Sequence, residues 1–209
     1  MRITNLRLAR QDRLVFEALS LQSKSHRLGL VGPNGAGKSS LLMALQGLIT
    51  ASEGEVELEG RPGFLFQNPD HQLLFPTVLE ELCFGARQRG AADAEGLARS
   101  MAGAHGAQHL LGLATHELSE GQKQLVCLLA VLMDEPDVLL LDEPCAGLDH
   151  RLTARLMKTL LGLPQRLIMA THQLELLQGF EEVIWIEDGK VQMQGPASAV
   201  VSAYAASGR

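Results

Sequence analysis

A glycine-rich stretch ending in a lysine and a serine has the clearest capacity for chemistry in this chain. It reads Gly32-Pro33-Asn34-Gly35-Ala36-Gly37-Lys38-Ser39 and lies between the apolar residues 28–31 and a helix-like run, 40–48. Glycines allow a tight turn in which successive N–H groups point at a polyphosphate, and the dipole of the following helix adds positive potential. Lys38 would reach the β- and γ-phosphates, and the Ser39 hydroxyl suits Mg²⁺, which prefers hard oxygen. An ordinary glycine-rich loop is the alternative, but these fixed positions arise by chance in only about one in a hundred such sequences.

Polar groups also follow two apolar runs that predict buried parallel strands. Residues 138–141 are followed by Asp142 and Glu143, and residues 167–170 are followed by His172. Functional groups in parallel sheets gather at the carboxyl ends of the strands, so the two carboxylates mark a candidate site. A lone histidine at a strand end is more often a hydrogen-bonded structural residue.

Capping patterns predict where three helices begin. Thr77 with Glu80 opens a helix toward residue 85, and Ser119 with Gln122 opens one over 123–133. The second of these presents another helix N-terminus suited to an anion. Asp149 is the expected N-cap of a helix that runs to about residue 163.

The remaining patterns predict one α/β domain with room for a small inserted subdomain. Polarity alternates over 2–8 and 15–21, which predicts an antiparallel pair joined across Gln11-Asp12. Asp188-Gly189 indicates a hairpin between strands 183–186 and 191–193. Further expected elements are short strands at 55–58 and 64–66, which place Gln67 at a strand end, helical structure over 91–113 and a short helix over 196–204.

Composition excludes several classes of protein. A formal charge of −6 and a pI near 5.6 argue against nucleic-acid binding, which requires clustered Lys and Arg. Cys83, Cys127 and Cys145 show no metal-ligand spacing and are expected to be reduced thiols of a cytosolic protein. We expect no secretory signal peptide, and the longest apolar run, 125–133, is too short to span a bilayer.

Taken in order, these motifs resemble those of the ATP-binding cassette ATPases over nearly the whole chain. Besides the phosphate loop, Gln67 is similar to the family's glutamine loop, 118–122 to its signature loop, 138–143 to its acidic strand, 146–149 to the loop after that strand and His172 to its switch histidine. The resemblance implies a P-loop NTPase core with a mostly parallel sheet flanked by helices, an N-terminal antiparallel β subdomain and an inserted α-helical subdomain. It assigns 1–66 and 134–209 to the core with its antiparallel part, and 67–133 to the glutamine loop and helical subdomain.

The same resemblance implies Mg²⁺-dependent hydrolysis of ATP. Glu143 would be the general base on the attacking water, with His172 at the γ-phosphate and Gln67 touching Mg²⁺ or water; Ser39, Gln67 and Asp142 would hold Mg²⁺. Nucleotide would be bound by Gly32, Pro33, Asn34, Gly35, Ala36, Gly37, Lys38, Ser39 and Ser40. Ser119, Gly121, Gln122 and Asp149 would act across a head-to-tail dimer, where the signature loop closes the partner's nucleotide.

A second set of residues is similar to the ATPases of energy-coupling-factor importers, which take up vitamins and transition-metal ions. The set is Gln67-Asn68-Pro69-Asp70-His71-Gln72, Phe75-Pro76-Thr77-Val78 and Cys83-Phe84-Gly85. This implies a second ATPase subunit, identical or not, and an integral membrane transport subunit, with the chain peripheral on the cytoplasmic side of the cell membrane. A solvated turn is the alternative for Asp70 and Gln72. A cassette ATPase without a membrane partner and a P-loop kinase or regulator remain open alternatives, and the transported substrate is not encoded here.

The chain departs from the family pattern at several positions. By spacing, the adenine-stacking aromatic residue falls near Arg10, which could stack through its guanidinium plane, and Phe16 is a second candidate. Glu120 replaces a signature glycine and is expected to point outward, because its carboxylate would repel a triphosphate. Leu125 and Cys145 replace a usual arginine and threonine, and the short span from Lys38 to Gln67 predicts a trimmed antiparallel subdomain.

Overall fold

The N-terminal strands form a small antiparallel sheet. The computed structural model describes residues 1–10 and 13–208. The sheet contains β1 (Arg2–Arg10), β2 (Arg13–Gln22) and β4 (Glu53–Glu57) in the order β2-β1-β4, with both pairings antiparallel. The predicted strand pair is therefore confirmed, whereas its predicted turn, Gln11-Asp12, lies outside the described residues. Ile3, Leu6, Leu8 and Phe16 point into the core.

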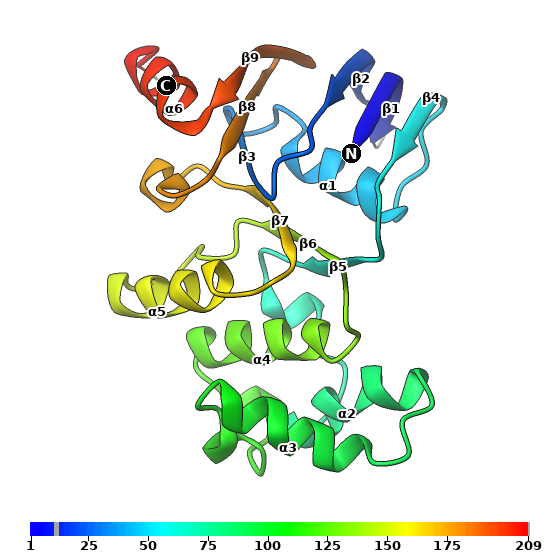
Figure 1. Ribbon diagram of the computed structural model, residues 1–209, viewed down its shortest axis with the longest axis vertical. Helices are drawn as coiled ribbons and strands as arrows, with labels where there is room; N and C mark the ends of the chain where they lie inside the picture. Colours follow the sequence, from blue (N-terminus) through cyan, green and yellow to red (C-terminus); the bar gives the residue numbers. More distant parts are fainter. Residues whose placement is uncertain (11–12, 209) are drawn as a thin grey trace. The chain divides into compact units, whose positions relative to one another are not determined.

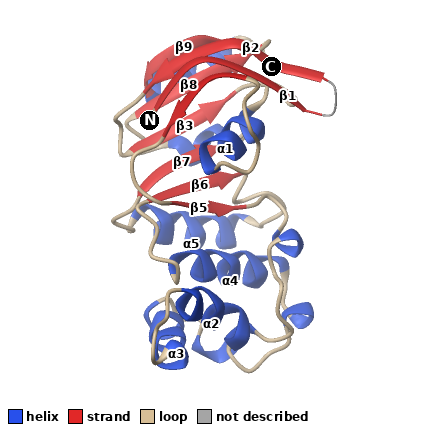
Figure 2. Ribbon diagram, turned by 90° about the vertical axis from the view of Figure 1, so that its right-hand side faces the viewer, coloured by secondary structure: helices blue, strands red, loops and turns tan. Residues whose placement is uncertain are grey.

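The second sheet has six strands, and the predicted polar groups Asp142, Glu143 and His172 lie at the ends of two of them. Its order is β5-β6-β7-β3-β8-β9, as Figure 2 shows. Strand β3 pairs in parallel with β7 and β8, β6 pairs in parallel with β7, and β8 and β9 form the predicted hairpin around Asp188-Gly189. The mostly parallel sheet is thus confirmed. The bounds are β3 (Arg27–Val31), β5 (Pro62–Leu65), β6 (Val138–Asp142), β7 (Arg166–Ala170), β8 (Glu182–Glu187) and β9 (Lys190–Pro196).

Two helices cover parts of this sheet. Helix α1 (Lys38–Gln46) contacts β6 and β7, and α6 (Ala197–Ala206) contacts β8 and β9. The Trp185 and Tyr204 rings meet edge to face with centroids 5.2 Å apart. All residues of β6 are buried, which explains why its sequence is continuously apolar up to Asp142.

The other helices belong to a second compact unit, formed by Leu65–Pro136 and Pro144–Pro164. It contains α2 (Val78–Gln88), α3 (Ala94–Ala104), α4 (Glu120–Leu132) and α5 (His150–Leu161), and α2 contacts both α3 and α4 (Figure 1). Both predicted capping boxes are present, at Thr77 and at Ser119. In the described residues, no helix is long and apolar enough to cross a membrane.

Element boundaries differ from the sequence prediction where local chemistry stops or starts a helix. Residues 91–113 were expected to be mainly helical, but α3 ends at Ala104, close to the left-handed Gly106, and only a short 3₁₀ turn, Gln108–Leu110, follows. Helix α4 starts at Glu120 rather than at 123, because the Ser119 side chain already caps the first turn. The three cysteines are buried, and none of them is part of a disulfide.

Candidate functional site

The phosphate loop turns between β3 and α1 through three glycines with positive φ. The angles are 148° at Gly32, 81° at Gly35 and 98° at Gly37. A Cβ at Gly32 would lie 2.0 Å from the Ile186 carbonyl oxygen, and a Cβ at Gly37 would lie 2.5 Å from Cζ of Phe16. Glycine is therefore required at these two positions by backbone conformation and by space. Of the other loop residues, Asn34 is exposed and Ala36 and Ser40 are buried.

Lys38 folds back over this loop. Its Nζ donates hydrogen bonds to the carbonyl oxygens of Gly32, at 2.7 Å, and Pro33, at 3.1 Å. Burial lowers the pKa of Lys38, while the nearby carboxylates of Glu143 and Asp142 act to raise it. The loop thus holds a buried cation beside its own backbone, which is the arrangement needed to bind an anion.

Ser39 and Asp142 bring two hard oxygen ligands together at the carboxyl end of β6. The Ser39 hydroxyl donates a hydrogen bond of 2.8 Å to Oδ1 of Asp142. Burial raises the pKa of Asp142, opposed by the Ser39 hydrogen bond and by the positive charges of Lys38 and Arg10. A hydroxyl and a carboxylate in contact are a donor pair of the type that Mg²⁺ prefers.

Glu143 and His172 form a second pair at the same edge of the sheet. Oε2 of Glu143 lies 2.8 Å from Nδ1 of His172 and accepts a hydrogen bond of 3.3 Å from the His172 backbone N–H. The Glu143 side chain is 10% exposed, that of His172 57%. Glu143 also has a φ of 47°, a conformation that costs about 1–3 kcal/mol for a residue other than glycine and concentrates at functional sites. The structure therefore brings together five predicted site residues: Lys38, Ser39, Asp142, Glu143 and His172.

The remaining predicted site residues belong to the second unit. Ser119 is exposed and shares its capping box with Gln122. A Cβ at Gly121 would lie 2.6 Å from Cδ1 of Leu152, whose backbone N–H bonds to the N-cap Asp149 at 2.8 Å. The Ser119 turn and the start of α5 are therefore neighbours. Gln67 is exposed and lies two residues after β5.

Comparison with known proteins assigns the family. The ABC transporter family model matches residues 17–146. The chain belongs to this family. The biotin transport ATP-binding protein BioM of Rhodobacter capsulatus is 38% identical over 98% of this chain and 93% of that protein. The energy-coupling factor transporter ATP-binding protein EcfA of Methanocaldococcus jannaschii is 33% identical over 86% of this chain and 72% of that protein.

A solved structure extends the similarity to the fold. It is cbiO1 from Clostridium perfringens, described as part of the ABC transporter complex cbiONQ. Its TM-score is 0.83 at 29% identity, over 96% of this chain and 90% of that one. The chain is thus an ABC ATPase, an enzyme that binds and hydrolyses ATP, with the P-loop fold that its motifs predicted.

Two features of this ABC ATPase were not resolved by sequence reasoning. Phe16 is fully buried with its ring under Gly37, so it supports the phosphate loop and is not available to stack on adenine, whereas Arg10 is exposed. Lys123, which the motifs did not single out, is paired with both Asp70 and Glu120. The spacing of three residues on one helix could have indicated the pairing of Lys123 with Glu120, but no local sequence pattern indicated its pairing with Asp70.

Proposed function

We propose that this chain is the ATPase subunit of an energy-coupling-factor type importer for a vitamin or a transition-metal ion. It would act at the cytoplasmic face of the membrane with a second ATPase subunit and an integral membrane transport subunit. Similarity to BioM and EcfA over most of the chain supports this class of transporter. The observation that carries the catalytic part is the Glu143 carboxylate, buried and bonded to His172, at the same edge as the Ser39–Asp142 pair.

In the proposed reaction, the loop N–H groups and Lys38 bind the phosphates of ATP. Because the Lys38 ammonium already lies at the loop, it only has to exchange its hydrogen bonds to two carbonyl oxygens for bonds to phosphate oxygens. Glu143 takes the proton from the attacking water, and His172 orients the water or the base. Ser39 and Asp142 would hold Mg²⁺, with Gln67, and the ion would neutralise charge that develops on the phosphates.

We further propose that two subunits enclose each ATP. Ser119, Gly121 and Gln122, with Asp149, would contact the nucleotide held by the partner's phosphate loop. The γ-phosphate is then contacted from both sides, so ATP favours the closed pair, and ADP lacks those contacts. Hydrolysis would reopen the pair.

The membrane subunit would bind the segment that starts at Gln67 within the helical part, 67–133. Exposed apolar side chains support this choice, since Leu74 is 72% and Phe84 40% exposed. The Phe84 ring packs against Phe75 with centroids 5.1 Å apart. Apolar groups of this kind on a surface commonly mark a protein contact.

Glu143→Gln tests the catalytic proposal. Glutamine keeps the shape and one acceptor oxygen but cannot take a proton, so ATP binding should persist while hydrolysis slows by about 10²–10⁴. The variant should also accumulate ATP-bound dimers on size-exclusion chromatography. Near-normal turnover would overturn Glu143 as the base, and ATP-dependent phosphorylation of an added acceptor by a monomer would favour a kinase.

Purification from detergent tests the transport proposal. A tagged chain should retain a multi-span membrane protein through affinity and size-exclusion steps. Recovery of active ATPase without such a protein, from cells that express the neighbouring genes, would favour a cassette ATPase that has no membrane partner.

A further inference from the structure

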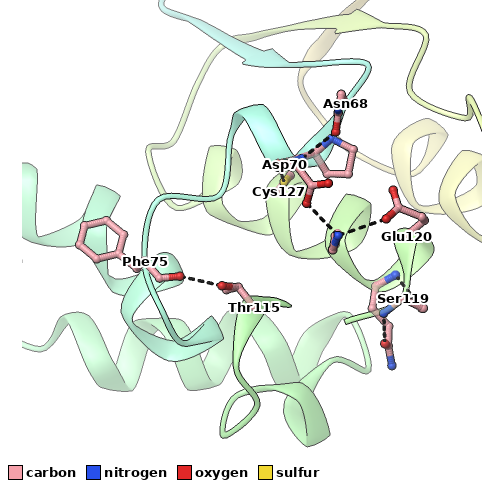
Figure 3. Close-up of polar contacts among 10 residues, drawn as sticks. Asn68, Asp70, Phe75, Thr115, Ser119, Glu120 and Cys127 are labelled. Carbon is pink, nitrogen blue, oxygen red and sulfur yellow. Dashed lines mark hydrogen bonds and ion pairs between the residues drawn. The ribbon is translucent and has the colours of Figure 1, made fainter. Parts of the chain in front are cut away.

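One lysine is shared between two acidic residues from distant parts of the second unit. Nζ of Lys123 lies 2.7 Å from Oδ1 of Asp70 and 3.1 Å from Oε1 of Glu120. In Figure 3 these two contacts are the dashed lines that start at the labelled carboxylates of Asp70 and Glu120. The Lys123 side chain is 13% exposed, whereas those of Asp70 and Glu120 are 57% and 61% exposed. Hydrogen bonds to both carboxylates raise the pKa of Lys123, which keeps it charged.

The turn that carries Asp70 is itself held in place. Asn68 accepts a hydrogen bond of 2.9 Å from the Asp70 N–H and so caps the 3₁₀ turn Pro69–His71. The Sγ of Cys127, one helical turn after Lys123, lies 3.7 Å from the Pro69 carbonyl oxygen. The turn is therefore attached to α4 at two points, and Asp70 fixes the Lys123 ammonium against the first turn of that helix.

The position of Glu120 relates the charge of Lys123 to the nucleotide site. It occupies the first position of α4, directly after Ser119. In the proposed dimer, this turn faces the triphosphate of the partner's nucleotide, where an unpaired carboxylate would repel the ligand and cancel part of the positive potential at the helix N-terminus. The Glu120 side chain is 61% exposed, and exposure alone does not remove its charge.

We propose that Lys123 is a positioning residue of the composite nucleotide site, which neutralises Glu120 so that the Ser119 turn can receive a triphosphate. This inference rests on the proposed function, because it requires the Ser119 turn to meet a nucleotide across a dimer. Glu120 and Lys123 are then a compensating pair: the carboxylate is tolerated beside the partner's triphosphate because a cation follows three residues later on the same helix.

The test measures the ATP concentration that drives half of the ATPase pair into the closed dimer. The pair is two copies of this chain, or this chain with its second ATPase subunit. Each copy of this chain carries Glu143→Gln to prevent hydrolysis, and a different second subunit carries the corresponding substitution. Lys123→Met keeps most of the length of the side chain and removes its charge, and should raise this concentration about 3–10-fold. Lys123→Arg should restore the parent value within about twofold, because the cation is kept.

The decisive variant combines Lys123→Met with Glu120→Gln. If the lysine acts by neutralising Glu120, the defect disappears when Glu120 carries no charge, and the double variant matches Glu120→Gln alone. A purely structural role of Lys123 predicts that the double variant stays as weak as Lys123→Met, which would overturn the inference. The defect should also shrink in about 1 M salt, where charges are screened beyond about 3 Å.

Arg99→Met is the matched control. It removes an arginine that pairs with Glu95 on α3 of the same unit, so it tests for a general effect of losing one surface cation. The ATP requirement should not change, and a shift equal to that of Lys123→Met would contradict a specific role. If the parent pair does not dimerise with ATP at all, the proposed function fails; if it does dimerise but Lys123→Met leaves the ATP requirement unchanged, only this inference fails.

Discussion

Two glycines of the phosphate loop provide a matched test of how the loop is supported. Gly35 and Gly37 both have positive φ, at 81° and 98°. A Cβ at Gly35 would have no atom within 4 Å, whereas a Cβ at Gly37 would lie 2.5 Å from Cζ of Phe16 and 2.6 Å from Cγ1 of Val15. Alanine at either position therefore pays the same kind of backbone strain, but only Gly37→Ala also overpacks a buried contact.

The magnitudes follow from these two contributions. Backbone strain at a positive φ costs about 1–3 kcal/mol for alanine and applies to both variants. Overpacking adds about 1–3 kcal/mol at Gly37, because Phe16 is fully buried and has little room to move. The difference of about 1–3 kcal/mol corresponds to roughly 2–12 °C in melting temperature for a chain of this size.

Thermal unfolding without nucleotide measures this difference. Gly37→Ala should melt below Gly35→Ala, and Phe16→Leu in the Gly37→Ala background should recover part of the loss by making space. Equal melting temperatures for the two alanine variants would refute the contact between the loop and Phe16. If Phe16→Leu does not raise the melting temperature of the Gly37→Ala variant, the loss of stability comes from the contact with Val15 or from backbone strain.

Three further substitutions test the charged groups around the loop. Lys38→Met should weaken ATP binding about 10–100-fold by calorimetry, because charge-assisted hydrogen bonds to the phosphates are lost, and an unchanged affinity would contradict the role of Lys38. Burial raises the pKa of Asp142, so the ionised form of this carboxyl opposes folding at neutral pH. Asp142→Asn should therefore raise the melting temperature of the chain at pH 7 measured without nucleotide. The same substitution should abolish the additional stabilisation by Mg²⁺ with ATP. A lower melting temperature would show that the charge stabilises the fold. Arg10→Ala should weaken ATP binding about 3–10-fold and leave tripolyphosphate binding unchanged if Arg10 stacks on adenine; equal losses for both ligands would assign Arg10 to the phosphates instead.

The parts of the fold that sequence could predict are those with local signals. Strands β3, β6 and β7 are continuous apolar runs, and each was predicted within a residue or so because buried parallel strands need no polar face. The caps at Thr77 and Ser119 were predicted because both partners of a capping box lie within four residues of each other. The groups at the strand ends could then be placed from strand direction alone.

Long-range partners could not be predicted in this way. Strands β4 and β5 are separated by only a short turn, yet β4 pairs with β1 and β5 joins the large sheet. Nothing in the local pattern distinguishes this arrangement from a hairpin. The burial of Phe16 under Gly37 and the bond between Lys123 and Asp70 likewise depend on which elements meet in three dimensions.

The polar groups of the phosphate site are hydrogen-bonded or paired with one another. Lys38 bonds to loop carbonyls, Asp142 accepts from Ser39, and Glu143 accepts from His172. Since a buried charge without a partner is strongly destabilising, these bonds stabilise the conformation of the loop. ATP must replace them and gains only the difference between the new bonds and the old ones. Each phosphate group therefore contributes noticeably to the net free energy of binding. The γ-phosphate, which ADP lacks, then largely determines that ATP and not ADP drives closure.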